Sequence, residues 1–309
     1  MARVLVTGGA GFIGSHLVDA LVGQKHQVLV IDNLSTGKRS NVPRSVSFSR
    51  SDIRSPRLKA SFQKFRPQFV FHLAAQKNVR MSVEDPLFDA EVNINGSLNV
   101  IELSRRYGVK KFIFSSTGGA LYGDGVQLPT PETVPPRPES PYGIAKFTVE
   151  QYLKFYQQVY GLASVSLRYA NVYGPRQDPK GEAGVVAIFA QRILRGQPLE
   201  INGHGRQTRD YVFVGDVVRA NMMAMRNTRV VGEINIGTGK QISVNDLAKS
   251  MIKIAGVKVM LVHRLAIAGE VMKSALLWQA AKKQFKWQPE VAMEKGLRMT
   301  WVWAKEALG

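Results

Sequence analysis

Tyr142 and Lys146 stand four residues apart, so on a helix they share one face. A phenol has a pKa of about 10, which is too high for a base at neutral pH. A neighbouring ammonium lowers that pKa because it stabilises the phenolate. Thr117 could bond the same substrate hydroxyl and hold it for proton removal. These residues predict general-base chemistry on an alcohol; the structural alternative is an amphipathic helix with a lysine that extends to solvent.

A glycine-rich stretch near the N-terminus could hold a cofactor. An apolar, β-branched run leads into it from residue 3, and Phe12 and Ile13 then begin an apolar helical pattern, which predicts a strand, a tight loop and a helix. Gly8, Gly11 and Gly14 are three residues apart, and residues 9–14 also read G-x-G-x-x-G. Such a backbone can approach a pyrophosphate closely, and the amides at the helix N-terminus would hold the anion.

Asp32 bears on which dinucleotide binds. It ends a second apolar run, residues 27–31, and lies 18 residues after Gly14. A carboxylate at this strand tip can accept both hydroxyls of an adenosine ribose and repels a 2′-phosphate. The spacing therefore favours NAD over NADP, with an ordinary turn and a solvated aspartate as the structural alternative. The positive nicotinamide ring of oxidised NAD would also lower the pKa of Tyr142.

Further strand-like runs alternate with segments of helical periodicity, at residues 46–48, 68–73, 111–116 and 164–168. The alternation predicts an α/β fold with a doubly wound parallel sheet of the Rossmann type, in which ligands lie beyond the carboxyl ends of the strands. Asp52 and Ile53 follow the third strand, where a carboxylate could bond the adenine amino group. Leu73, Ala74 and Ala75 follow the fourth, where the alanines would let a cofactor lie against the backbone.

The pattern changes after residue 170. Residues 171–210 are rich in Gly, Pro, Gln and Arg, with one helical stretch at 185–194. We expect a NAD-binding domain over residues 1–170 and a smaller, interleaved substrate domain over 171–309. Strands near residues 211–214 and 233–236 are expected to return to the first sheet.

Two long helical segments, residues 87–107 and 143–160, are mixed in polarity. On one flank of the sheet they could pair with those of a second copy, which predicts a homodimer with a four-helix interface. The structural alternative is ordinary packing with one face toward solvent.

Composition narrows the class of protein. With 309 residues and 45% hydrophobic content, the chain can bury a sizeable core. The absence of cysteine excludes disulfides and thiolate metal sites, and the five histidines lack H-E-x-x-H spacing, so no metal is expected. A strand beginning at residue 3 and the lack of any apolar run near 18 residues predict a cytoplasmic protein without signal peptide or membrane span.

The formal net charge of +19 has two explanations. It could indicate nucleic-acid binding, or a basic surface around a site for an anionic substrate. Lysines and arginines are spread along the chain in runs of at most two. Dispersed charge is typical of a solvated surface, so we do not expect a nucleic-acid partner.

Six motifs together resemble the extended short-chain dehydrogenases/reductases, at residues 6–15, 31–37, 114–123, 141–146, 167–177 and 207–214. Within that group the chain most resembles the NAD-dependent nucleotide-sugar epimerases of the UDP-glucose 4-epimerase type, over residue 1 to about 260. The resemblance implies a tightly held NAD and a UDP-sugar substrate.

The resemblance also implies site residues, position by position. For the cofactor these are Gly8, Gly11, Phe12, Ile13, Gly14, Asp32, Asn33, Asp52, Ile53, Leu73, Ala74, Ala75, Lys77, Asn93, Tyr142, Lys146 and Tyr169. For the substrate they are Lys77, Thr117, Tyr142, Asn171, Val186, Arg209, Glu270 and Ser274. The catalytic set is Thr117, Tyr142 and Lys146.

The implied reaction is inversion at C4 of the sugar. Tyr142 takes the proton of the 4-hydroxyl as C4 gives hydride to NAD, the 4-keto sugar turns over, and hydride returns to its other face. Related dehydratases and decarboxylases usually carry an acidic residue after the catalytic hydroxyl, where this chain has Gly118 and Gly119. That difference favours an epimerase over a dehydratase. Another reaction of the same fold, 4,6-dehydration or reduction of a keto sugar, is the nearest alternative. A non-catalytic NAD-binding protein with a basic RNA-binding surface is the alternative outside this chemistry.

The C-terminal part departs from the family pattern. An Arg-x-Gly-Asp/Glu element reads Ile-Ala-Gly-Glu at 267–270, so the carboxylate remains as Glu270 and the arginine does not. Met272 and Leu277 stand where relatives tend to carry another arginine and an aspartate. Arg209, with Arg264 or Lys273 as substitute, would have to hold the diphosphate.

Ser274 lies four positions after Glu270, where related epimerases place a residue beside the C2 substituent of the sugar. Its small side chain predicts a pocket that accepts N-acetylated sugars. The alternative is that Ser274 faces the core and that Met272 or Leu276 closes the pocket.

Overall fold

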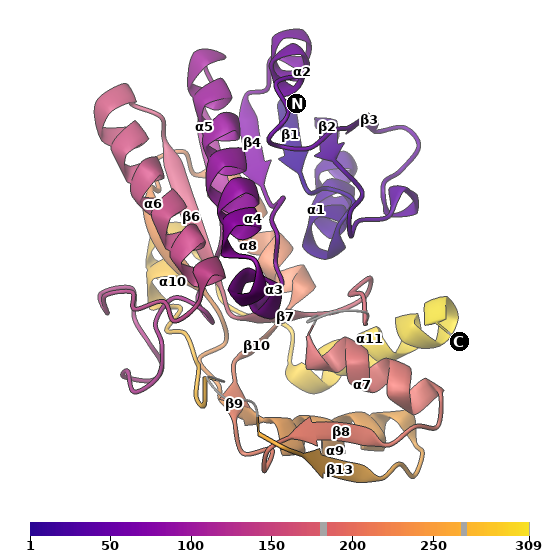
Figure 1. The fold of residues 1–309 in the computed structure, drawn as a ribbon. Helices are drawn as coiled ribbons and strands as arrows, with labels where there is room; N and C mark the ends of the chain where they lie inside the picture. Colours follow the sequence, from indigo (N-terminus) through magenta and orange to yellow (C-terminus); the bar gives the residue numbers. More distant parts are fainter. Residues whose placement is uncertain (180–183, 267–270, 309) are drawn as a thin grey trace.

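A seven-stranded parallel sheet forms the centre of the computed structural model, which describes residues 1–179, 184–266 and 271–308 (Figure 1). Its strands are, in spatial order, β3 (Ser47–Arg50), β2 (Gln27–Asp32), β1 (Arg3–Thr7), β4 (Phe69–His72), β5 (Lys111–Thr117), β6 (Ser164–Tyr169) and β11 (Gly232–Ile236). Chain order reverses between β1 and β4, and at such a point the loops that follow the strands diverge and leave a crevice. The predicted doubly wound Rossmann sheet is confirmed.

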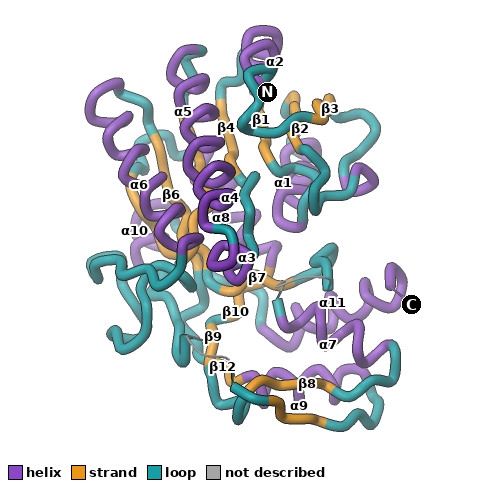
Figure 2. Tube along the Cα trace, viewed as in Figure 1, coloured by secondary structure: helices purple, strands orange, loops and turns teal. Residues whose placement is uncertain are grey.

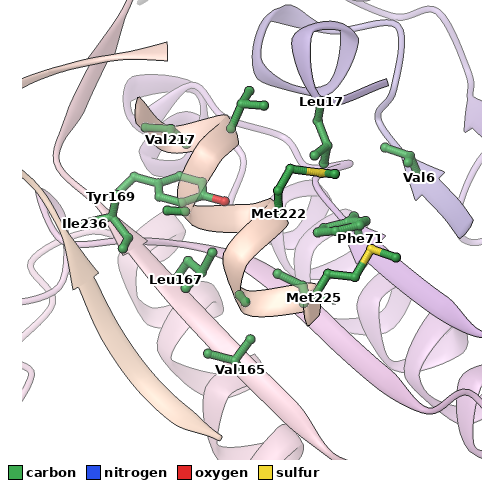
Figure 3. Packing of buried hydrophobic residues seen from close by; sticks show 14 of the residues in the cluster. Val6, Leu17, Phe71, Val165, Leu167, Tyr169, Val217, Met222, Met225 and Ile236 are labelled. Atoms are coloured by element: carbon green, nitrogen blue, oxygen red, sulfur yellow. The ribbon is translucent and has the colours of Figure 1, made fainter. Parts of the chain in front are cut away.

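Helices cover both faces of this sheet (Figure 2). One face packs against α1 (Phe12–Gly23), α8 (Val214–Arg226) and α10 (Gln279–Phe285). The other packs against α2 (Leu58–Phe65), α5 (Gly96–Arg106) and α6 (Pro141–Tyr160). Figure 3 shows Leu17 of α1 and Met222 and Met225 of α8 gathered over Phe71 and Leu167 of the sheet. Because both faces are covered, the strands read as continuous apolar runs.

The helix expected over residues 87–107 is divided into three parts. After α3 (Val79–Glu84), the chain forms α4 (Pro86–Ala90), a single π turn η2 (Glu91–Asn95) and then α5. The helix expected over residues 143–160 is α6, which begins two residues earlier. Ser140 caps it by accepting a hydrogen bond from the Gly143 backbone amide at 3.2 Å.

A smaller unit lies beyond the carboxyl ends of the strands (Figure 1). Helices α7 (Val185–Leu194), α9 (Val244–Ala255) and α11 (Met293–Leu308) share its core with the parallel pair β8 (Leu199–Asn202) and β13 (Leu261–Arg264). Two short strand pairs and a 3₁₀ turn complete the assigned elements: β7 (Asn171–Tyr173) with β10 (Tyr211–Phe213), β9 (Thr208–Arg209) with β12 (Ile242–Ser243), and η1 (Arg39–Asn41). Within the described ranges, no helix is both long and apolar enough to span a bilayer.

The two strands expected to return to the sheet behave differently. Residues 232–236 do return, as β11 beside β6. Residues 211–213 instead form β10, which pairs with β7 outside the sheet, and Val214 begins α8. The edge of β6 is occupied by β11, so the expectation for residues 211–214 is wrong for this reason.

Lys111 at the start of β5 carries a fully buried ammonium group. Its Nζ donates hydrogen bonds to the carbonyl oxygens of Asn227 at 2.5 Å and Val230 at 2.7 Å, beyond the end of α8. Burial lowers the pKa of Lys111 to about 8, because the charged form loses hydration.

We therefore predict a stability that depends on pH through Lys111. Between pH 8 and 10.5 the unfolded chain binds more protons at this lysine than the folded protein does, so the free energy of unfolding rises with pH across that window. Relative to Lys111→Met, the wild type should gain about 2–3 kcal/mol over that range in urea unfolding. Parallel pH dependence in the two proteins would contradict the assignment.

Candidate functional site

The glycine-rich loop between β1 and α1 is folded too tightly for side chains. Gly8 has a φ of +69°, and a Cβ there would lie 2.6 Å from the backbone nitrogen of Ala74. A Cβ on Gly14 would lie 2.2 Å from the Gly8 carbonyl oxygen. Gly11 is the N-cap of α1. It has no side chain that could accept hydrogen bonds from the first-turn amides of α1, so that residue does not cap these amides. This cradle fits the pyrophosphate of a dinucleotide.

Asp32 is held beside this loop at the carboxyl end of β2. Its carboxylate accepts hydrogen bonds from the backbone amides of Ala10 at 2.9 Å and Leu34 at 2.8 Å. The segment over residues 34–41 closes the loop from the other side, and no site residue was predicted there. A Cβ on Gly37 would lie 2.9 Å from the Ala10 carbonyl carbon, and the Asn41 side chain donates to the Ala10 oxygen at 3.0 Å.

Asp52, after β3, is engaged by an arginine that the motifs did not indicate. Arg54 donates to both carboxylate oxygens, at 2.9 and 3.0 Å, and Asn33 donates to one of them at 3.0 Å. These hydrogen bonds from Arg54 lower the pKa of Asp52 to about 2. Ile53 is buried against Gly96 of α5. The turn after β3, from which the adenine contacts are predicted, is therefore fixed in place.

The segment after β4 rests on a buried polar chain. The backbone amides of Leu73 and Ala74 donate to the Thr7 hydroxyl at 3.2 and 3.3 Å. That hydroxyl lies 2.6 Å from His72 Nδ1, and His72 Nε2 lies 2.9 Å from the Ser97 hydroxyl. Burial lowers the pKa of His72 to about 3, so the imidazole is neutral at physiological pH. His72 therefore fixes the backbone of Leu73 and Ala74. The expected cofactor would lie against this backbone and against Ala75, the next residue.

Asn93 and Lys77 have different places beside this segment. The Asn93 amide is buried in the π turn, accepts a hydrogen bond from the Gln76 backbone amide at 2.9 Å and donates to the Gln76 carbonyl at 2.9 Å. It therefore clamps the loop that follows β4. The Lys77 side chain is exposed at the end of that loop.

Lys146, with the Tyr142 ring beside it, reaches the carboxyl end of β5, where Thr117 is the last residue of the strand. Lys146 Nζ donates to the Ser115 carbonyl at 2.9 Å and lies 5.8 Å from the centre of the Tyr142 ring. A Cβ on Gly143 would lie 2.4 Å from the Ala120 carbonyl, so only glycine lets the first turn of α6 rest on the turn after Thr117.

Burial acts on the two ionisable groups of this set in opposite senses. It lowers the pKa of Lys146 to about 8 and raises the pKa of Tyr142, because each group loses hydration of its charged form. Proton removal by Tyr142 consequently requires positive charge beside the phenolate, and Lys146 is placed to supply part of it.

A buried ion pair fixes α6 to the sheet. Arg168 of β6 donates to Glu150 through Nη2 at 2.5 Å and Nε at 3.0 Å, and the Ser116 hydroxyl donates to Glu150 at 2.6 Å. Glu150 lies one turn beyond Lys146 on the same face of α6. Removing one partner would leave an uncompensated buried charge. The sequence motifs gave no indication of this network.

Two expected contacts point elsewhere. The Tyr169 phenol is buried on the α8 side of the sheet, where Asn221 donates to it at 2.8 Å (Figure 3). The Val186 side chain is fully buried in the core of the smaller unit. A sequence motif does not specify which way a side chain points. In the structure, neither of these two side chains faces the crevice. A cofactor or substrate contact from these residues would have to come from their backbone.

Asn171 and Arg209 lie in the short strands β7 and β9. The Asn171 side-chain oxygen lies 3.6 Å from a Cβ built on Gly119, next to the turn after Thr117. Arg209 donates from Nη1 to the Thr208 carbonyl at 2.9 Å. Arg264, considered above as a diphosphate ligand, instead donates to Glu200 at 2.8 Å. The structure therefore does not support that role for Arg264.

The diverged C-terminal segment is tied to the site by its backbone. Asp124 accepts hydrogen bonds from the amides of Met272 at 2.8 Å and Lys273 at 3.2 Å, and Leu277 donates to the Thr130 carbonyl at 2.9 Å. Asp124 was not among the predicted residues. Glu270, with residues 267–269, lies outside the described residues.

Within that segment, Ser274 is bound to Thr208 and Leu276 packs against the turn after Thr117. The Ser274 amide donates to the Thr208 carbonyl at 3.2 Å, and its side chain is 9% exposed. Leu276 is buried, and its δ-methyl carbon lies 2.3 Å from a Cβ built on Gly118. Leu276 thus occupies the space that a side chain at position 118 would need. In the described part of the chain, no cluster of three or more His, Cys, Asp and Glu residues could hold a metal ion.

The chain is similar to known proteins along most of its length, and these proteins belong to the group that its motifs resemble. The model of the NAD dependent epimerase/dehydratase family matches residues 4–237. The crystal structure of UDP-glucose 4-epimerase with UDP-glucose from Thermotoga maritima is 51% identical, covers 99% of this chain and 100% of its own, and has a TM-score of 0.96. UDP-glucose 4-epimerase of Thermus thermophilus, in complex with NAD, is 46% identical with a TM-score of 0.94 and 99% coverage of both chains.

A third structure is more distant in sequence. It is UDP-N-acetylglucosamine 4-epimerase from Methanobrevibacter ruminantium in complex with UDP-N-acetylmuramic acid, which is 34% identical, covers 99% of this chain and 98% of its own, and has a TM-score of 0.94. Because the family model spans the whole cofactor crevice and the solved structures align over nearly the full length, the chain belongs to the NAD dependent epimerase/dehydratase family, and its cofactor is NAD.

Proposed function

We propose that the protein inverts C4 of a UDP-sugar through a 4-keto intermediate. The observation that carries this proposal is the pairing of Tyr142 and Lys146 at the end of β5, the strand that Thr117 ends, together with a glycine loop that could hold NAD. The substrate class is supported by the two UDP-glucose 4-epimerases that align over nearly the whole chain.

Each of these side chains has one task. Tyr142 receives the proton of the sugar 4-hydroxyl and later returns it, and Thr117 holds that hydroxyl by a hydrogen bond. Lys146 stabilises the phenolate from its place on the Ser115 carbonyl. When bound, NAD supplies the acceptor and donor of hydride, and its positive ring adds to the field that lowers the pKa of Tyr142.

Gly118 favours epimerisation over dehydration. Related dehydratases usually have an acidic residue at this position, whereas here Leu276 packs directly over the glycine. A carboxylate could not be accommodated without displacing Leu276 from the core. The keto intermediate would therefore meet no acidic group from this position that could promote elimination.

The sugar pocket is proposed to accept N-acetyl groups. Ser274 is small, and its backbone is fixed beside Thr208, one residue from Arg209. The related enzyme from Methanobrevibacter ruminantium is a UDP-N-acetylglucosamine 4-epimerase, which supports this extension of the substrate class.

A second copy of the chain is the proposed partner. Helix α6 exposes a row of large apolar side chains: Ile144, Tyr152, Phe155, Val159 and Tyr160. The Glu102 carboxylate of α5 accepts a hydrogen bond from Tyr156 of α6 at 3.1 Å, which holds the two helices together as one surface. Burial of this surface in a four-helix interface would remove the exposed apolar area from water.

The first prediction for this function concerns the cofactor. Because Asp32 repels a 2′-phosphate, the nucleotide released from the purified protein by acid should be NAD, and NADP should not replace it in reconstitution. Chromatography of the released nucleotide checks this. Mainly NADP in the extract would mean that Asp32 does not contact the ribose.

The second prediction concerns the general base. Tyr142→Phe should retain the fold and NAD but lower turnover of UDP-glucose and UDP-galactose at least about 100-fold, measured by the anomeric proton signals in NMR. Tyr107→Phe makes the same substitution at the C-terminal end of α5, at a residue with no proposed role, and should have little effect. Near-normal turnover of Tyr142→Phe would remove this residue from the mechanism.

The third prediction concerns sugar selection. Ser274→Tyr should reduce kcat/KM for UDP-N-acetylgalactosamine about 10- to 100-fold while sparing UDP-galactose, because the phenol fills the space of an acetamide. Ser274→Ala is the matched control and should change neither substrate appreciably. If the wild type ignores N-acetylated sugars, or if Ser274→Tyr suppresses both classes equally, Ser274 does not control access.

A further inference from the structure

Asp89 is a buried carboxylate beside the catalytic pair, and the mechanism above does not use it. It lies in α4, and its side chain is 1% exposed. One oxygen, Oδ1, accepts hydrogen bonds from Gln76 Nε2 at 2.9 Å and Asn93 Nδ2 at 2.8 Å. The other oxygen, Oδ2, is also buried and has no hydrogen-bond partner among the described residues. A buried carboxylate oxygen in this state needs compensation from a nearby positive charge.

Asp89 lies in a segment that packs against α6. The π turn η2 begins two residues after Asp89, and both α4 and η2 pack against α6. Such turns occur frequently at functional sites because the extra residue redirects the side chains around it. Here the turn brings Asn93 onto the same carboxylate oxygen that Gln76 contacts.

Lys146 belongs to the same buried cluster as Asp89. Its Nζ lies 4.7 Å from the centre of the Phe114 ring, which stacks on His72. His72 is linked through the Ser97 hydroxyl to Asn93, which donates to Asp89.

The Asp89 carboxylate opposes the effect of burial on Lys146 and raises the pKa of that ammonium. The same negative charge adds to burial in raising the pKa of Tyr142. Both effects act across the contact between α4 and α6.

The other charged and titratable groups around Asp89 do not replace it as a main counter-charge to the Lys146 ammonium. From α6, Glu150 also raises the pKa of Lys146, but it is committed to the ion pair with Arg168. From β4, His72 is neutral because burial lowers its pKa to about 3. The remaining charged side chains on the neighbouring segments are exposed to solvent: Lys77, Arg80, Glu84, Asp85 and Glu91.

We propose that Asp89 is a positioning residue for the proposed epimerase reaction: its carboxylate keeps Lys146 protonated in a buried place and so sets the pH range in which Tyr142 and Lys146 act as a pair. This inference rests on the proposed function for its kinetic consequence. Its electrostatic part is the effect of the Asp89 charge on Lys146 and Tyr142, and it concerns only the described residues.

Neutralising Asp89 should move both limbs of the activity profile in one direction. Loss of a nearby negative charge lowers the pKa of every group that it faces, so Tyr142 becomes a base at lower pH and Lys146 loses its proton at lower pH. The bell-shaped dependence of kcat/KM on pH should therefore shift toward acid as a whole. A merely structural defect would lower the rate without moving the limbs.

The test compares Asp89→Asn with the wild type in the NAD-loaded protein. The asparagine oxygen can accept the same two hydrogen bonds from Gln76 and Asn93, so the substitution removes charge with little change in shape. Both limbs should shift by about one pH unit toward acid. Glu91→Gln, which removes an exposed charge two residues away, is the matched control and should leave both limbs in place.

A second readout does not depend on turnover. NMR of protein labelled with ¹³Cζ-tyrosine, with the Tyr142 signal assigned by its loss in Tyr142→Phe, reports the pKa of Tyr142 directly. That pKa should fall in Asp89→Asn and stay unchanged in Glu91→Gln. Asp89→Ser, also uncharged but smaller, should give the same fall and serves if the asparagine variant does not fold.

The two readouts separate failure of this inference from failure of the proposed function. If the wild type does not epimerise UDP-sugars, the proposed function fails, and the Tyr142 titration still decides whether Asp89 acts on the pair. An unchanged pKa of Tyr142 in the folded Asp89 variants overturns the inference. Unshifted limbs with a lower rate at every pH overturn it as well.

Discussion

The buried ammonium of Lys146 is the constraint on which the site depends. A charge removed from water is stable only if nearby groups replace its hydration. Here the Ser115 carbonyl accepts its hydrogen bond, the Phe114 ring lies 4.7 Å away, and the carboxylates of Asp89 and Glu150 supply opposite charge. These groups come from β5, α4 and α6, so the elements must dock closely before the lysine can be charged. Gly143 makes that docking possible where α6 meets the turn after Thr117.

The cofactor crevice shows the same dependence of chemistry on backbone placement. The glycines of the first loop, the Thr7 hydroxyl and the Asn93 amide bring three chain segments within hydrogen-bond distance at the point where the strand order reverses. None of these contacts involves a mobile surface side chain. The crevice is therefore held by contacts within the chain itself, and a site that is fixed in this way loses less entropy on binding.

The sequence predicts those parts of the fold and of the site whose signal is local, that is, carried by residues close together in the chain. The glycine loop, Asp32 and the spacing of Tyr142 and Lys146 follow from short-range geometry, and the structure places them at one edge of the sheet. The ion pair of Glu150 and Arg168 joins residues that are 18 positions apart, and no spacing rule predicts it. The π turn was also missed, because an apolar helical period continues through one inserted residue.

Tyr169 and Val186 show a different limit. A motif gives the position of a residue in the chain, but the direction of its side chain follows from which face of a strand or helix becomes buried. Met272 and Leu277 show why side chains could diverge in the C-terminal segment: Asp124 and Thr130 bind their backbone groups, which every residue type supplies.

The most direct test of the account is incubation of the purified protein with UDP-glucose in D₂O, followed by proton NMR of the sugar. Transfer of hydride to and from the same bound NAD predicts UDP-galactose that retains protium at C4, with no added cofactor and no deuterium in the ring. Formation of a 4-keto-6-deoxy sugar with deuterium at C5, or incorporation of deuterium at C4, would contradict the proposed reaction.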